Sequence, residues 1–351
     1  MVSKVALAAI LQLLLNSIIS AGVIQRECHY SSFSDQPDLF LRAIHRFNGK
    51  SIPRTGGHIS GGIVTHHFLA SELMVEYFET LAGNAKPQRV VIIGPDHSGR
   101  VPKGLAISGL KWKTPFGYLQ PDRKAIRVIG KYLGLKDNNP EYFFKEHSIG
   151  ILVPFVKYYF PHAKIVPVIV GEGISRDSLE QLVHALGEIS DDNTHVILSM
   201  DFSHGKTAEE GKLTDAIAAD VILNGAYDKI WGLDVDCRPG LYLMLRLHAK
   251  DRVIIGTHSN SAEVSRKNLK NCTTYFTVYF ISAARRLAGE VKIPSQCSVG
   301  RKILIGARLL DFVSGTCAIL HHAADQIDVG GSNALHDEAG ICSAHSVTND
   351  A

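Results

Sequence analysis

The sequence predicts an α/β protein with three layers, in which helices cover both faces of a mostly parallel central sheet. Short runs of apolar, β-branched residues alternate with longer segments whose apolar residues recur at helical spacing. This alternation is typical of βαβ units that share one sheet. The clearest strand covers residues 90–93, where four β-branched residues in a row end abruptly at Gly94 and Pro95. We therefore place this strand at the centre of the predicted sheet.

The first half of the chain contains both patterns, segments with helical spacing of apolar residues and short apolar runs typical of strands. Residues 39–47 are expected to form a helix because Phe40, Ile44 and Phe47 recur at helical spacing. Glycines at helix ends and Ser148 as an N-cap favour three further helices. These helices cover residues 69–81, 122–133 and 149–160. The expected strands cover residues 61–64, 90–93, 105–108 and 110–113.

The second half continues the alternation. Buried strands are expected over residues 164–170 and 195–200, because nearly every position there is apolar. Helices are expected over residues 175–189, 209–223 and 226–233, followed by one that Pro239 and Gly240 open and that runs to about His248. Strands over residues 253–257 and 273–281 complete the domain.

Composition restricts the class of protein. The chain has 351 residues, of which 45% are hydrophobic and 20% charged, so it can bury a sizeable core. The net charge of +3 is mild and no basic run is interleaved with aromatic residues, which argues against nucleic acid as the main partner. We expect one domain over residues 25–285 and a small, polar, Gly/Ala-rich appendage over residues 286–351 that is partly disordered.

The amino terminus predicts export or membrane contact. Residues 5–23 form an apolar run behind Lys4, so residues 1–24 are expected to be a signal peptide or a membrane anchor. Gln12, Asn16 and Ser20 recur at a spacing of four, so the alternative is an amphipathic helix of a cytoplasmic protein.

Four polar clusters follow predicted strands or precede predicted helices. They are His66-His67, Asp96-His97, Asp201-Phe202-Ser203-His204 and Asp236-Cys237. The carboxyl ends of parallel strands meet at one edge, where ligands of open α/β sheets bind. Two imidazoles and one anion with open positions are expected for a transition metal. The alternative for each histidine is a buried packing residue with its own hydrogen-bond partner.

Cysteine usage agrees with a metal site better than with a disulfide scaffold. The six cysteines contain no CxxC pair, so a zinc finger or a disulfide framework is not expected. Cys237 precedes a predicted helix start, where the helix dipole lowers a thiol pKa and favours a metal-binding thiolate. The alternative is a small buried hydrophobe.

These motifs together resemble the Memo-like family, also called AmmeMemoRadiSam system protein B. The motifs that carry the resemblance are Thr65-His66, Gly94-Pro95-Asp96-His97, Glu146-His147-Ser148-Ile149 with Pro154-Phe155, Asp201-Phe202-Ser203-His204, and Cys237. The resemblance covers about residues 27–283. It implies the fold of the class III extradiol dioxygenases and a metal site at His66, His97 and Cys237, with Asp201, His204 and His147 beside it.

The resemblance also implies two alternative functions. In the first, the protein is an iron- or copper-dependent oxidoreductase of the dioxygenase type, in which the metal ligands hold Fe(II) or Cu(I) and His147 or His204 acts as acid or base, with Asp201 nearby. In the second, it is a non-catalytic protein whose metal pocket binds a small molecule or a peptide. Zinc is less expected, because a zinc hydrolase needs a general base and no clear glutamate apart from Glu146 lies near a ligand.

Overall fold

The computed structural model describes residues 29–282, apart from residues 49, 51, 54, 136–139, 145 and 268–269. The predicted signal peptide or anchor and the predicted appendage therefore lie outside the described residues. Within the described part of the chain, no helix combines the length and apolarity that a membrane span requires.

The centre of the molecule is a parallel sheet, as predicted. Strands β6 (Gly117–Pro121), β7 (Lys164–Val170), β3 (Arg89–Pro95), β8 (Thr194–Ser199) and β2 (His58–Val64) lie side by side in this order, and all four pairings are parallel. The apolar residues of β3 are fully buried, because helices cover both of its faces. The position of β3 inside the sheet confirms that the 90–93 run is a central strand.

Antiparallel strands extend both sides of this parallel core. β11 (Cys272–Ser282) pairs with β2, and β10 (Arg252–Asn260) pairs with β11. On the other side β5 (Lys111–Thr114) pairs with β6. The remaining short strands are β1 (His29–Ser31), β4 (Leu105–Ile107) and β9 (His204–Lys206).

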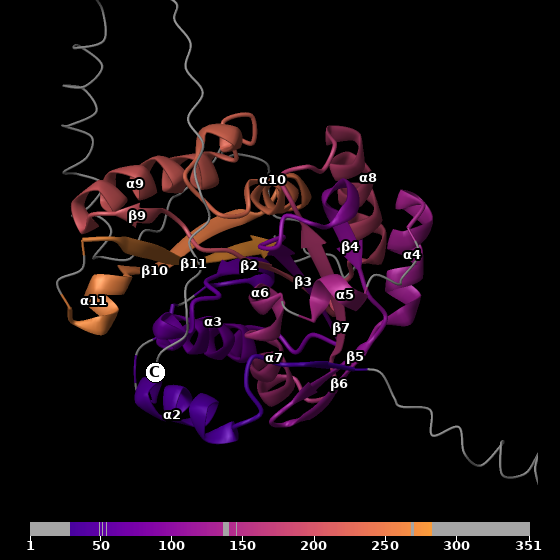
Figure 1. Cartoon of the computed structure of the whole chain (residues 1–351), viewed down its shortest axis with the longest axis horizontal. Helices are drawn as coiled ribbons and strands as arrows, with labels where there is room; N and C mark the ends of the chain where they lie inside the picture. The colour runs from indigo at the N-terminus through magenta and orange to yellow at the C-terminus, as the bar shows by residue number, and fades with distance from the viewer. Residues whose placement is uncertain are drawn as a thin grey trace, which may run out of the picture. The chain divides into compact units, whose positions relative to one another are not determined.

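Helices form a layer on each face of the sheet (Figure 1). One layer contains α2 (Pro37–Phe47), α3 (Ser71–Asn84) and α7 (Val153–Tyr159). The other contains α4 (Arg123–Leu133), α8 (Arg176–Ile189), α9 (Ala208–Asn224) and α10 (Arg238–Leu247). The short helical segments are α5 (Pro140–Phe143), α6 (His147–Gly150), α11 (Ser261–Ser265) and the 3₁₀ turns Phe68–Ala70, Pro102–Gly104 and Ile230–Gly232. The predicted three-layer α/β/α architecture is confirmed.

Two predicted helices differ from the structure. The segment over residues 149–160 is two helices, α6 and α7, and the N-cap of α6 is Glu146 rather than Ser148, because the Glu146 carboxylate accepts the hydrogen bond of the Ser148 N–H. Pro154, in the first turn of α7, has no N–H and so starts a new helix more readily than it continues one. The segment over residues 226–233 contains only the 3₁₀ turn Ile230–Gly232.

A close approach of two backbones positions α6. Gly94 lies near the carboxyl end of β3, and a Cβ atom there would overlap the Ser148 side chain. Because glycine lacks this atom, α6 can lie directly against β3. The contact brings Glu146 and His147 beside the loop that follows β3, although about fifty residues separate them in sequence.

Candidate metal centre

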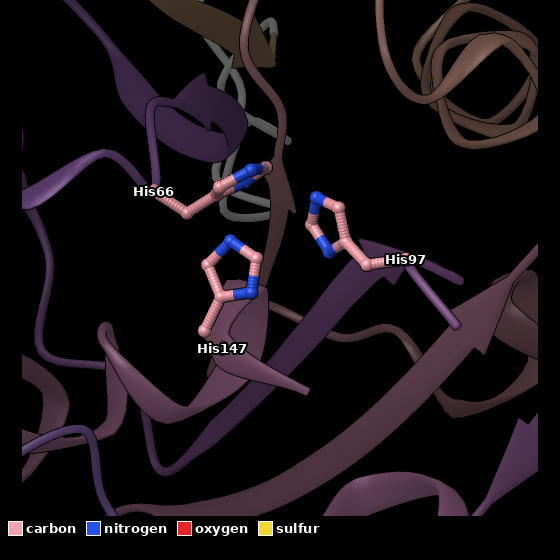
Figure 2. A group of neighbouring side chains, drawn as sticks. All are labelled: His66, His97 and His147. Carbon is pink, nitrogen blue, oxygen red and sulfur yellow. The ribbon is translucent and has the colours of Figure 1, made fainter. Parts of the chain in front are cut away.

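Three histidines from three elements meet at the carboxyl edge of the sheet. His66 follows β2, His97 follows β3, and His147 is the first residue of α6. One ring nitrogen of each lies within 4.8 Å of the corresponding nitrogens of the other two. Figure 2 shows the three rings facing one another. The structure thus brings together His66 and His97, two predicted metal ligands, and places His147, predicted as an acid or base, beside them.

Ser199 determines which nitrogen of His66 is available. The Ser199 hydroxyl donates its proton to the Ser148 carbonyl oxygen at 2.6 Å, and its oxygen lies 3.2 Å from His66 Nδ1. Because the hydroxyl proton is already used, Nδ1 must donate to the serine oxygen. In the neutral ring Nε2 therefore carries the lone pair, which is the form that binds a metal.

Glu146 plays the same part for His97. His97 Nδ1 lies 2.7 Å from Glu146 Oε1, and the His97 backbone N–H donates to Oε2 at 3.1 Å. Burial raises the pKa of the Glu146 carboxyl. Hydrogen bonds from His97 and Ser148 and the charge of His97 lower this pKa by more than burial raises it, so the pKa is below its ordinary value. The ionised carboxylate accepts from Nδ1–H and leaves Nε2 open, as in carboxylate–histidine–metal arrangements.

His147 is neutral at physiological pH. Its ring stacks on that of His97, with centroids 4.1 Å apart. Burial, and then the positive charges of His97 and His66, lower the His147 pKa to about 4. The side chains of His97 and His147 are 33% and 48% exposed, so the cluster opens to solvent on their side. A neutral, accessible imidazole can bind a metal or accept a proton from a ligand.

Two carboxylates also lie close to His66. His66 Nε2 lies 3.2 Å from Asp236 Oδ2 and 3.9 Å from Asp201 Oδ2. Burial by itself lowers the pKa of His66, but the negative charges of Asp201 and Asp236 outweigh it and raise the pKa to about 9. The site therefore attracts a cation, which is a proton when no metal competes. His66, Asp201 and Asp236 form a second group with the spacing of metal ligands.

Asp201 holds the chain at His66. Its Oδ1 accepts hydrogen bonds from the Thr65 hydroxyl and, at 3.2 Å, from the His66 backbone N–H. It is 3% exposed. These contacts fix the corner that follows β2 and so orient the His66 ring. Asp201, predicted to lie near the site, lies within it.

Two other predicted residues lie outside both ligand groups. Cys237 is the buried N-cap of α10, and its thiol packs against Gly240. Burial and the nearby negative charges of Asp236, Glu172 and Glu146 raise the pKa of the thiol well above its ordinary value. His204 is exposed at the start of β9. The Cys237 ligand and the His204 acid or base therefore stay predictions.

A cavity of about 500 Å³ lies at the other, amino-terminal end of the sheet. Its lining includes Arg89 and Lys164, the first residues of β3 and β7. Arg89 Nε donates to Asp122 Oδ2 at 2.7 Å, so much of the charge in this cavity is paired within the protein. The convergence of ligand atoms occurs at the histidine cluster and not in this cavity.

Sequence reasoning did not identify Ser199 as a partner of His66, or Glu146 as the partner of His97. Ser199 is the last residue of a buried strand and resembles other strand-end serines, so its own position carries no signal. Glu146 had a weak signal, because it precedes His147 within a motif that the resemblance singled out. Which loop residues these side chains contact depends on strand order, and single-sequence periodicity does not report strand order.

Comparison with known proteins identifies relatives. Residues 30–234 match a family model described as Memo-like protein. A MEMO1 family protein of Pyrobaculum aerophilum is 32% identical over 187 residues, which are 51% of this chain and 66% of that protein. A MEMO1 family protein of Desulfurococcus amylolyticus is 31% identical over 212 residues, which are 58% of this chain and 71% of that protein. The matched part of this chain thus spans slightly less than two thirds of the Pyrobaculum protein.

A solved structure is also similar. The crystal structure of an uncharacterized protein from Escherichia coli K12 covers 62% of this chain and 99% of its own, with a TM-score of 0.41 and 10% sequence identity.

The family match includes His66, His97, Glu146, His147 and Asp201, and it ends two residues before Asp236.

Proposed function

The chain belongs to the Memo-like protein family, and we propose that it is a metal-binding protein whose histidine cluster holds a first-row transition metal. The observation that carries this proposal is the fixed tautomer of two converging histidines. Ser199 and Glu146 occupy Nδ1 of His66 and His97, which leaves Nε2 of each ring for a metal, and the two rings belong to one group whose ligand atoms lie within 4.8 Å of one another. A packing histidine has no need of a second nitrogen that is directed at other potential metal ligands.

The finer proposal is an iron- or copper-dependent oxidoreductase resembling the class III extradiol dioxygenases. Imidazole ligands suit Fe, Cu and Zn alike, so the ligand set alone does not separate them. A bound ion would supply Lewis-acid or redox chemistry at the open side of the cluster. The chain's own residues orient it: Glu146 and Ser199 hold two rings in place, and the neutral, 48% exposed His147 is placed to accept a proton from a substrate hydroxyl.

The second candidate function is non-catalytic binding of a small molecule or peptide at the same cluster. Apolar side chains next to His66 favour it. Leu69 is 42% exposed, and Phe33, which is 50% exposed, stacks on Phe68 with ring centroids 5.6 Å apart. Exposed apolar groups beside polar ligands are typical of binding surfaces.

Metal occupancy tests the proposal common to both functions. Elemental analysis of the purified full-length protein should find a stoichiometric transition metal, and His97→Ala should lose most of it. His162→Ala is the matched control, because His162 is an exposed histidine at the amino-terminal end of the sheet. Equal occupancy in the two variants would contradict the proposal.

Turnover separates the two functions. Protein loaded with Fe(II) without oxygen is mixed with catechols and oxygen, and ring-cleavage products are measured. Product formation that His147→Ala reduces while metal stays bound supports the oxidoreductase. Stoichiometric ligand binding without product supports the binding protein.

A further inference from the structure

Two adjoining cavities lie at the amino-terminal end of the sheet, at the opposite end of the strands from the histidine cluster. The first is the cavity of about 500 Å³ that Arg89 and Lys164 line, and the second has a volume of about 310 Å³. Gln88 and His162 line both cavities, so the two share a wall. Both volumes fall in the range of sites that bind small molecules. One molecule can therefore extend from the first cavity into the second.

The carboxylates of the first cavity are held by partners within the protein. Arg89 Nε donates to Asp122 Oδ2 at 2.7 Å, and Arg89 Nη1 lies 3.9 Å from Asp191 Oδ2. Asp122 Oδ1 accepts the hydrogen bond of the Ala125 N–H at 3.1 Å. Asp191 Oδ1 accepts the hydroxyl proton of Thr194 at 2.8 Å. Arg89 is thus the cation with which both carboxylates are paired.

Two lysines of the same cavity have no such partner. Lys124 and Lys164 are exposed, and neither ammonium group forms an ion pair or a hydrogen bond within the part of the chain that the structure describes. Burial raises the pKa of Asp122, but its hydrogen bonds and the charges of Arg89 and Lys164 lower it below its ordinary value. The ammonium group of Lys164 therefore lies near Asp122 without pairing with it. The cavity carries more positive than negative charge, and so it attracts an anion.

The amino end of α4 adds to this positive potential. Asp122 is the N-cap of the helix and Lys124 is its second residue, and both line the first cavity. The backbone dipoles of a helix place a partial positive charge at its N-terminus, where anions bind favourably. The helix end and the two lysines thus favour the same kind of ligand in the same cavity.

The second cavity has a mostly apolar lining. The apolar residues that line it are Ala82, Pro87, Tyr159, Phe160, Pro161 and Ala163. Lys86 and the shared residues Gln88 and His162 add polar groups at this site. Small-molecule sites typically combine a predominantly apolar lining with a few polar groups that fix the orientation of the ligand. The second cavity is therefore suited to the apolar part of a molecule whose charged part lies in the first.

From this arrangement we propose that the two cavities form one binding site for a small phosphate monoester. The first cavity holds the phosphate group, and the second holds the apolar or aromatic body that is esterified to it. A phosphate monoester carries a charge of about −1.5 to −2 at pH 7, which matches two unpaired lysines better than the single charge of a carboxylate does. The inference does not depend on the proposed metal centre, because none of the candidate metal ligands lines either cavity.

The test measures binding of 1-naphthyl phosphate to the full-length protein by isothermal titration calorimetry. Inorganic phosphate and 1-naphthol are titrated separately, because each represents one part of the ester. We expect the ester to bind at least about tenfold more tightly than either part, since it alone places groups in both cavities. Absence of binding would overturn the inference, and so would an ester that binds no more tightly than inorganic phosphate.

Substitutions of the lysines locate the site. Lys124→Gln and Lys164→Gln should each lower the affinity for 1-naphthyl phosphate about fivefold, because each removes one cation that contacts the phosphate. Lys131→Gln is the matched control, since Lys131 is an exposed lysine in the last turn of α4, and it should change the affinity less than about twofold. Equal affinities in these three variants would show that the phosphate does not lie in the first cavity.

His97→Ala separates this site from the metal centre, because a phosphate group also binds to metal ions. The affinity of His97→Ala for 1-naphthyl phosphate should equal that of the wild type. Loss of binding in His97→Ala, together with full binding in Lys124→Gln and Lys164→Gln, would place the ester at the histidine cluster and overturn the inference.

Discussion

His195 and His66 are two buried histidines at opposite ends of the parallel strands. His195 is near the amino end of β8, His66 follows the carboxyl end of β2, and neither is more than 3% exposed. Both nitrogens of His195 are used: Nε2 lies 2.7 Å from the Tyr77 hydroxyl, and Nδ1 lies 3.2 Å from the Ile59 carbonyl oxygen. His66 instead shares only Nδ1 with a neutral group and directs Nε2 at carboxylates.

The two environments move the pKa in opposite directions. Burial among neutral partners lowers the pKa of His195 to about 3. For His66 the charges of Asp201 and Asp236 overcome an equally complete burial and raise the pKa to about 9. Burial therefore does not distinguish a packing histidine from a candidate ligand. The charge of the partners does.

The largest expected effect is the change in the free energy of unfolding of the metal-free protein with pH. Because the folded pKa of His66 is raised from 6.5 to about 9, its contribution is fully present below pH 6.5 and is lost as the pH rises through 9. The loss is about 3 kcal/mol. The lowered pKa of His195 has the opposite sign, so its contribution is lost as the pH falls from 6.5 toward 3.

Chemical denaturation between pH 3 and 9 checks both losses of stability. In His66→Gln the free energy of unfolding should stay nearly constant between pH 6.5 and 9. Its decline below pH 6.5, which His195 causes, should remain. A decline between pH 6.5 and 9 that is equally steep in His66→Gln would show that His66 is not charged in the folded protein.

The next effect concerns His195. Tyr77→Phe removes the hydroxyl that pairs with Nε2 and leaves a buried ring nitrogen without a partner. We expect the free energy of unfolding to fall by about 2 kcal/mol, while metal affinity stays unchanged. Tyr132→Phe, at a 44% exposed tyrosine, is the control and should cost less than about 0.5 kcal/mol. A loss of metal in Tyr77→Phe would contradict the conclusion that His195 and the metal centre are independent of each other.

The smallest effect concerns the orientation of His66. Ser199→Ala removes the acceptor of Nδ1–H, so Nε2 is no longer the preferred lone-pair position. We expect the metal affinity to fall about tenfold, which corresponds to about 1.4 kcal/mol. Ser190→Ala is the control, because it removes only a hydroxyl that bonds to a carbonyl at the end of α8. Equal affinities in these two variants would mean that Ser199 has no part in the site.

The sequence by itself predicted the sheet and most of the helices. Residues 90–93 are β-branched and apolar throughout, and they form the buried part of β3 because only a strand covered on both faces accommodates such a run. The prediction of a helix over residues 226–233 was wrong, because the chain leaves α9 through Gly225, at a φ of 62°, and continues as a turn. Helical spacing alone does not detect such an exit.

The position of His66 and His97 in one cluster was also predictable, because residues after parallel strands meet at the same edge of the sheet. The tertiary structure decided the rest. His97 and Glu146 are 49 residues apart, and His66 and Ser199 are 133 apart. Whether Asp236 or Cys237 faces the histidines depends on how the start of α10 meets the loop after β8. Periodicity reports which face of an element is buried, whereas a ligand shell depends on which distant side chains share hydrogen bonds. Those bonds are formed only when the strands take their order in the sheet.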